Sequence, residues 1–202
     1  MEKQRNKIKL IIFDLDGTLV NLRINYERMR EKLRNLFKKY EIEENFESIV
    51  SSLQRGLRRI KEKVGNEEYE RVKSKAFSII DEEEMKAKIE ILKESKEILK
   101  KLSKNFKLVL ITRNGRKITE KSLKKMEVYN LFQEIVTRED VKDFSDKREA
   151  SKKILEKFNI KPNEVLFVDD KEWILKEIHS LGFNRFLIKT PKDLKRLEEI
   201  YL

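Results

Sequence analysis

Short runs of apolar residues recur along the chain, and each has the length of a strand in a buried sheet. In the second half of the chain they alternate with segments in which apolar residues recur at the spacing of a helix. The apolar runs cover residues 8–13, 108–111, 134–136, 165–168 and 186–188, and the helical patterns cover residues 115–126, 148–158, 172–181 and 191–200. Strands and helices that alternate in this way predict an α/β fold built on a doubly wound parallel sheet.

The interval between the first two runs breaks this rhythm, because about ninety residues separate Thr18 from Leu108. One crossover helix needs far fewer residues. Helical spacing recurs in residues 26–40, 46–64, 67–80 and 82–102, with breaks expected at residues 43–45 and 65–66. We therefore expect a core of residues 1–21 and 91–202 and an α-helical insertion at residues 22–90. The residues expected to pack the last of these helices against the sheet are Ile91, Ile98, Leu99 and Leu102.

The composition fits one sizeable core with a small inserted domain. The chain has 202 residues, of which 42% are charged and 39% hydrophobic. The absence of cysteine excludes disulfides and thiolate metal ligands. The apolar run at residues 8–13 is too short to span a membrane, and no cleavage site of small residues follows it. We expect a cytoplasmic protein without a membrane partner, and the sequence indicates no oligomeric state.

Positive charge is concentrated in one part of the chain. The formal net charge is +11, and residues 91–126 carry 12 Lys or Arg against 3 Glu. Such a field attracts phosphates, nucleotides or nucleic acid, but a solvated lysine-rich surface on amphipathic helices has the same composition. The sequence has no recognisable nucleic-acid-binding module and no alternation of basic and aromatic residues. We therefore favour a small phosphorylated substrate over nucleic acid as the partner.

Polar side chains that suit phosphate chemistry directly follow three of the predicted strands. They are Asp14 and Asp16 after the first strand, Thr112 and Arg113 after the second, and Asp169 and Asp170 after the strand at residues 165–168. Ligands of open α/β sheets bind at the carboxyl ends of the strands, and residues two apart on an extended chain point the same way. Converging carboxylates repel one another unless a cation lies between them, so the sequence predicts a site for Mg²⁺.

These residues resemble the motifs of the haloacid-dehalogenase-like hydrolase superfamily, whose fold is a Rossmann-like core with a variable cap. Residues 14–18 match its Asp-x-Asp-Gly-Thr motif, Thr112 matches the hydroxyl that ends the next core strand, Lys147 matches the lysine upstream of the last motif, and Asp169 with Asp170 matches the final acidic pair. The four motifs occur in order, and the insertion lies where the family's helical cap lies. The resemblance therefore implies a phosphatase with a Rossmann-like core at residues 1–21 and 91–202 and a helical cap at residues 22–90.

The resemblance also implies a role for each matched residue. Asp14 is the nucleophile that forms an aspartyl-phosphate, and Asp16 acts first as an acid and then as a base. Thr112 and Lys147 bind the phosphoryl oxygens, together with Arg113 and backbone N–H groups near it. Mg²⁺ is held by Asp14, by the main-chain carbonyl of Asp16 and by the final pair. In that pair Asp170 is expected to be the direct ligand and Asp169 a second ligand or an acceptor behind it.

Two alternatives stay open at this point. A sugar-phosphate mutase of the same superfamily passes the phosphoryl group to a second hydroxyl instead of water. A nucleic-acid-binding protein or a phosphatase of polynucleotide ends is the other alternative. The dehalogenase branch lacks the second aspartate of the first motif, so Asp16 argues against carbon–halogen cleavage. We expect Trp173 to pack beneath the sheet edge and His179, the only histidine, to lie on the surface or in helix packing.

Overall fold

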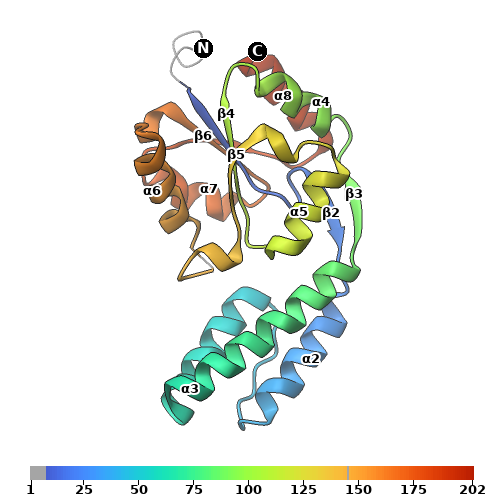
Figure 1. The fold of residues 1–202 in the computed structure, drawn as a ribbon, viewed down its shortest axis with the longest axis vertical. Coiled ribbons are helices and arrows are strands. Elements are labelled where there is room, and N and C mark those ends of the chain that lie inside the picture. Colours follow the sequence, from blue (N-terminus) through green and yellow to red (C-terminus); the bar gives the residue numbers. More distant parts are fainter. Residues whose placement is uncertain (1–7, 145) are drawn as a thin grey trace. The chain divides into compact units, whose positions relative to one another are not determined.

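The core of the computed structural model, which describes residues 8–144 and 146–202, is a five-stranded sheet. Its strand order is β5-β4-β1-β6-β7, and every neighbouring pair is parallel (Figure 1). The strands are β1 (Leu10–Phe13), β4 (Lys107–Ile111), β5 (Phe132–Val136), β6 (Val165–Asp169) and β7 (Asn184–Leu187). The predicted α/β class with a doubly wound parallel sheet is confirmed.

Helices cover both faces of this sheet, so its central strands are buried on both sides (Figure 1). Ile12 of β1 and Phe167 of β6 belong to one apolar cluster with residues of α6 and α7. Ile11 and Phe13 alternate to the other face and are also fully buried. The helices are α4 (Ser95–Leu102), α5 (Arg116–Lys125), α6 (Lys147–Phe158), α7 (Glu172–His179) and α8 (Pro191–Tyr201), with short 3-10 turns at Tyr129–Leu131, Arg138–Asp140 and Pro162–Glu164.

The chain divides into two compact units, one of Met1–Leu22 with Ile89–Leu202 and one of Arg23–Lys88. The second unit consists of helices α2 (Tyr26–Lys38) and α3 (Ile49–Lys86), which lie side by side (Figure 1). Its core contains Phe37 and Phe46, whose rings meet edge to face with centroids 5.3 Å apart. Gly65 interrupts α3 with a non-helical backbone (φ 80°, ψ 179°), at one of the two breaks expected from the sequence.

The prediction of a helix at residues 82–102 is wrong. The chain there forms the end of α3, the strand β3 (Lys88–Ile91) and then α4. Strand β3 pairs with β2 (Val20–Arg23), a strand that the pattern of apolar residues did not predict. The left-handed backbone of Glu94 (φ 70°) separates β3 from α4 and prevents one continuous helix. Ile98, Leu99 and Leu102 are buried as expected, but Ile91 is 40% exposed because it belongs to the strand.

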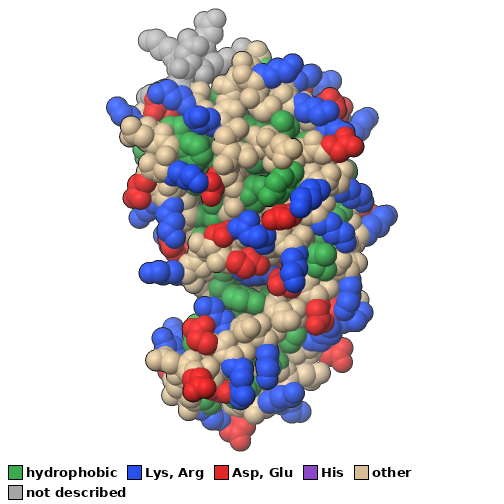
Figure 2. All heavy atoms as spheres, in the orientation of Figure 1, with side chains coloured by type: hydrophobic (Ala, Val, Ile, Leu, Met, Phe, Trp, Pro, Cys, Tyr) green, Lys and Arg blue, Asp and Glu red, His purple; other side chains and the backbone are tan. Residues whose placement is uncertain are grey.

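The surface carries charges of both signs. On the face drawn in Figure 2, Lys and Arg side chains are interspersed with Asp and Glu side chains. Several lysines of the basic segment have acidic partners, among them Lys96 with Glu127 and Lys124 with Glu120. Among the described residues, no helix combines the length and the apolar character that crossing a membrane requires.

Candidate active site

Two buried carboxylates lie at the carboxyl ends of neighbouring strands. Asp14 follows β1, and its N–H donates to the carbonyl of Val168 at 3.0 Å. Asp169 ends β6 and is fully buried, whereas Asp14 is 7% exposed. The register pairs Phe13 with Val168, so the next residue of each strand lies at the same level. The parallel sheet therefore forces the two acids together at one edge.

Lys147 lies between these two carboxylates. It is the first residue of α6, whose N-cap Asp146 accepts a hydrogen bond from a backbone N–H of the first turn. The Nζ of Lys147 donates to Asp14 Oδ1 at 2.6 Å and to Asp169 Oδ2 at 2.7 Å. Burial disfavours the charged form of Lys147, but Asp14 and Asp169 hold its pKa above the ordinary value. Lys147 is therefore a fixed cation beside Asp14.

Removing this cation is expected to destabilise the fold. In the Lys147→Met variant, Asp14 and Asp169 lose their shared partner, and unpaired buried charges of this kind cost about 3–5 kcal/mol. The loss in the free energy of unfolding, measured by urea denaturation, should be smaller at pH 5 than at pH 8, because Asp14 takes up a proton at low pH. Lys153→Met, which removes an exposed lysine paired with Glu149 on the same helix, is the control. A Lys147→Met variant as stable as this control would contradict the expectation.

The folded protein disfavours the ionised form of the Asp14 carboxyl group. Burial raises the pKa of Asp14 from 3.8 to about 6, and the repulsion of Asp169 and Asp170 adds to this effect while Lys147 opposes it. The single lysine thus does not fully offset burial and the negative charge around Asp14. A further cation at this position would favour the carboxylate form.

Because the ionised form of Asp14 lowers the stability of the fold, we expect Asp14→Asn to stabilise the metal-free protein at high pH. The pKa is higher in the folded than in the unfolded protein, so the folded state binds the proton more tightly, and stability falls as the pH rises from about 4 to about 6. At pH 8 the variant should gain up to about 3 kcal/mol, since one pKa unit corresponds to about 1.4 kcal/mol. Urea unfolding of wild type and variant at pH 4 and pH 8 measures the difference. The same difference at both pH values would contradict the assignment.

Asp170 supplies the third carboxylate of the cluster and has an unused oxygen. Carboxylate oxygens of Asp14, Asp169 and Asp170 all lie within 4.8 Å of one another. Both oxygens of Asp169 are occupied, by Lys147 Nζ and by the Lys171 N–H at 2.8 Å. Asp170 Oδ2 accepts from Lys171 Nζ at 2.5 Å, whereas its buried Oδ1 has no hydrogen-bond partner among the described residues. An orphaned carboxylate oxygen beside Asp14 fits a small divalent cation such as Mg²⁺.

Gly17 allows Asp170 to approach the loop after β1. The φ of Gly17 is +88°, and a Cβ atom there would lie 2.4 Å from Asp170 Oδ2. We expect Gly17→Ala to weaken Mg²⁺ binding, measured by calorimetry, and to lower the free energy of unfolding by more than the roughly 1–2 kcal/mol that a left-handed backbone costs a non-glycine residue. Gly65→Ala is the matched control, because Gly65 also has a positive φ (+80°) but has no atom within 4 Å of the added methyl group. Equal effects of the two substitutions would show that the contact with Asp170 has no importance.

The Asp16 carboxylate is not part of this cluster. Its Oδ1 accepts from the Leu22 N–H at 2.7 Å. The expectation that Asp14 and Asp16 point the same way assumed an extended chain, but β1 ends at Phe13 and the next residues form a tight turn. In that turn the carbonyl of Leu15 accepts from three successive N–H groups, so the alternation of an extended strand no longer applies.

Thr112 and Arg113 lie at the end of β4, the strand on the other side of β1. Thr112 is 4% exposed, and its hydroxyl donates to Asn114 Oδ1 at 2.9 Å and accepts from the Asn114 N–H at 3.2 Å. The guanidinium of Arg113 lies 5.0 Å from the ring centre of Trp173. Trp173 is 48% exposed, so the expectation that it packs beneath the sheet edge is wrong. No sequence pattern predicts this contact, because the two residues are sixty positions apart.

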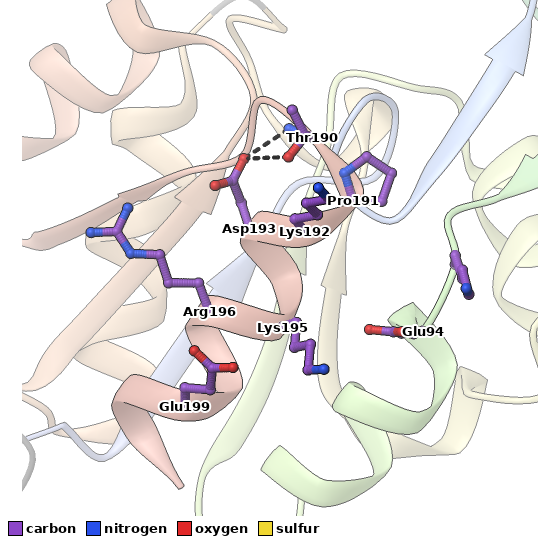
Figure 3. Close-up of a pocket in the computed structure, with 9 residues that line it drawn as sticks. Glu94, Thr190, Pro191, Lys192, Asp193, Lys195, Arg196 and Glu199 are labelled. Carbon is purple, nitrogen blue, oxygen red and sulfur yellow. Dashed lines mark hydrogen bonds between the residues drawn. The ribbon is translucent and has the colours of Figure 1, made fainter.

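A large hollow lies elsewhere in the core, at the start of α8 and the loop before α4 (Figure 3). Its volume is ≈ 870 Å³, and none of the site residues expected from the sequence lines it. Its charges nearly balance, because its lining has four cations, Lys93, Lys192, Lys195 and Arg196, and three anions, Glu94, Asp193 and Glu199. Asp193 is occupied by the Thr190 N–H and hydroxyl, drawn as dashed lines in Figure 3. The hollow offers no chemistry comparable to the cluster around Asp14.

The chain is similar to proteins of known sequence and structure. The chain is 28% identical over 166 residues to the pyrophosphatase PpaX of Bacillus mycoides (strain KBAB4). The aligned segment covers 81% of this chain and 75% of that protein. PpaX of Bacillus thuringiensis (strain Al Hakam) is 27% identical over 166 residues, with the same coverage of both chains. A predicted phosphoglycolate phosphatase from Haemophilus somnus 129pt has a similar structure, with a TM-score of 0.63, 20% identity and coverage of 97% of this chain and 99% of that one.

A second structural relative was determined with a metal. The hydrolase YfnB of Bacillus subtilis, bound to magnesium, has a TM-score of 0.54 and 14% identity over 96% of this chain and 99% of its own. At such identities the structural likeness concerns the fold alone.

The sequence model of the haloacid dehalogenase-like hydrolases matches residues 11–179, a span that contains every residue of the cluster. The chain therefore belongs to the haloacid dehalogenase-like hydrolase family.

Proposed function

We propose that the protein is a Mg²⁺-dependent phosphatase that hydrolyses a small phosphate monoester through an aspartyl-phosphate on Asp14. The observation that carries the proposal is the Asp14 carboxylate, which lies at a strand end beside a buried cation and beside the orphaned oxygen of Asp170. Lys147 occupies Oδ1 of Asp14, and the Asp14 side chain remains 10% exposed. A nucleophilic oxygen that a substrate can reach is thus available. The names of the PpaX and phosphoglycolate phosphatase relatives support a phosphate substrate.

Each residue of the site has a step in this reaction. Asp14 attacks the phosphorus, the bond from phosphorus to the leaving oxygen breaks, and Asp16 protonates that oxygen. Asp16 then takes a proton from water, the water oxygen bonds to phosphorus, and the bond from phosphorus to Asp14 breaks. Inorganic phosphate and the free carboxylate of Asp14 are the products. Lys147 and Thr112 hold the phosphoryl oxygens during both displacements.

The cation site has a supporting role in this proposal. Asp14, Asp170 and the main-chain carbonyl of Asp16 would hold Mg²⁺, and Asp169 orients Lys147 from behind. When bound, Mg²⁺ offsets the repulsion between the anionic nucleophile and the anionic substrate. Both oxygens of Asp169 already accept hydrogen bonds, which supports Asp170 over Asp169 as the direct ligand. The magnesium bound to YfnB supports the choice of metal.

The unit of Arg23–Lys88 would act as a helical cap that contributes contacts to the leaving group. Its position within the chain supports this role, because the insertion leaves the core directly after the turn that carries Asp16 and returns through β3. A cap excludes water from the site during phosphoryl transfer.

A panel of phosphate compounds tests the proposed function. Phosphoglycolate, inorganic pyrophosphate, sugar phosphates and nucleotides are each incubated with the protein and Mg²⁺, and released phosphate is measured. We expect turnover of at least one small member, together with a hydroxylamine-labile phosphate on the protein when labelled substrate is used. Formation of an isomeric sugar phosphate without free phosphate would instead identify a mutase. No turnover of any member would reject the proposal.

A further inference from the structure

An arginine lies over the ring of a tryptophan at the edge of the site. Arg113 follows Thr112 at the end of β4, and Trp173 lies in the first turn of α7, three residues after Asp170. The guanidinium carbon lies 5.0 Å from the centre of the indole ring, within the range of a cation–π contact. Because β4 and β6 pair with β1 on opposite sides, this contact joins the two strand ends that flank Asp14.

Trp173 is a large apolar residue that is not packed into the core. Its side chain is 48% exposed, one of few large apolar side chains of the described residues left in solvent. A cation–π contact with a half-exposed indole restricts the arginine side chain on one side. An arginine restricted in this way loses less conformational entropy when it binds an anion.

Arg113 also differs from the other cations near the site in having no acidic partner. Lys147 pairs with Asp14 and Asp169, Lys171 pairs with Asp170, and Arg116 pairs with Asp140. Among the described residues, the Arg113 guanidinium forms no ion pair, and it lies over the Trp173 ring. Its carbonyl, not its side chain, accepts from Arg138. The positive charge of Arg113 is therefore available to a ligand.

We propose that Arg113, held by Trp173, binds a second anionic group on the leaving portion of the substrate. The inference rests on the proposed phosphatase function and narrows its substrate class. The preferred substrates are phosphate esters or anhydrides whose leaving group carries a carboxylate or a phosphate close to the bond that breaks. A guanidinium binds either anion with paired, charge-assisted hydrogen bonds. The transferring phosphoryl group is already served by Lys147 and Thr112, so Arg113 is a specificity residue and Trp173 a positioning residue.

Matched substrates separate this role from a contact with the transferring phosphoryl group. Phosphoglycolate is compared with 2-hydroxyethyl phosphate, which replaces the carboxylate by a neutral group, and pyrophosphate is compared with methyl phosphate. In Arg113→Met, kcat/KM for the two anionic compounds should fall roughly 10- to 100-fold, mainly through KM, as expected for the loss of a charged hydrogen bond. The neutral compounds should change less than about threefold, and Arg113→Lys should keep part of the preference.

Trp173 is tested in the same assay. Trp173→Leu should lower the preference for anionic compounds by a smaller factor than Arg113→Met, and Trp173→Phe should restore most of it because the stacking face is kept. The control is Lys117→Met, which removes an exposed charge from α5 and should leave all four rates within about twofold. Thermal melts verify that the variants fold.

Each outcome decides the inference. A loss confined to phosphoglycolate and pyrophosphate supports it. An equal loss on all four compounds would assign Arg113 to the transferring phosphoryl group and overturn it, and so would unchanged rates on all four. Wild-type protein that releases phosphate from no compound at all would overturn the proposed function itself, and the inference with it.

Discussion

Asp14→Asn is expected to lower kcat for phosphate release by at least about a thousandfold, because the amide cannot form the aspartyl-phosphate. The substitution changes neither the size nor the hydrogen-bond reach of the side chain by much, so substrate binding should persist. The measurement is released phosphate at saturating Mg²⁺, with any compound of the panel that the wild type hydrolyses. The labelled aspartyl-phosphate should disappear together with turnover.

The stability of this variant excludes the simplest alternative explanation. Because the ionised Asp14 lowers the stability of the metal-free fold, an inactive Asp14→Asn protein should be folded and at least as stable as the wild type at pH 8. Asp143→Asn, which changes an exposed carboxylate of the core, controls for a general effect of lost charge and should keep full activity. Substantial turnover by Asp14→Asn would show that another group attacks the phosphorus and would reject the mechanism.

The sheet and its acidic edge could be predicted from the sequence because both depend on short-range pattern. An uninterrupted apolar run of four or five residues, such as the one that ends at Phe13, is buried whichever way its side chains point, so it indicates a central strand. In a parallel sheet the residue after each such run must then lie at the ligand-binding edge. That rule alone brings Asp14 and Asp169 together, although 155 positions separate them.

The remaining features depend on contacts that leave no local pattern. The strand pair β2 and β3 joins residues almost seventy positions apart, and the sequence of β3 fits a helix equally well until its partner is known. The hydrogen bond of the Leu22 N–H to Asp16 Oδ1 depends on the turn around Leu15, where the strand alternation ends. The contact of Arg113 with Trp173 exists only because β4 and β6 flank β1. Tertiary structure decides all three.

Removal of divalent metal is expected to abolish turnover, and added Mg²⁺ is expected to restore it. Asp14, Asp169 and Asp170 lie within 4.8 Å of one another, and two lysines, Lys147 and Lys171, pair with these three carboxylates. The substrate would therefore add negative charge to a cluster that its lysines do not fully neutralise. The measurement is phosphate release after treatment with a chelator and during Mg²⁺ titration. Because Asp14 has a pKa of about 6 in the metal-free protein, a proton competes with the metal, and the apparent Mg²⁺ affinity should weaken below pH 6 by up to about tenfold per unit.

Two variants of the final acidic pair separate the metal ligand from its supporting neighbour. Asp170→Asn alters the carboxylate whose Oδ1 is orphaned, so it should weaken Mg²⁺ binding roughly 100-fold or more while the fold keeps its stability. Asp169→Asn alters a carboxylate whose oxygens bind Lys147 and the Lys171 N–H, so its main effect should be a loss of stability. Calorimetric Mg²⁺ titration and urea unfolding of both variants measure the two effects. If Asp169→Asn weakened Mg²⁺ binding and Asp170→Asn lowered stability instead, Asp169 would be the metal ligand. In the chelator experiment, full activity after metal removal would exclude a metal from the reaction.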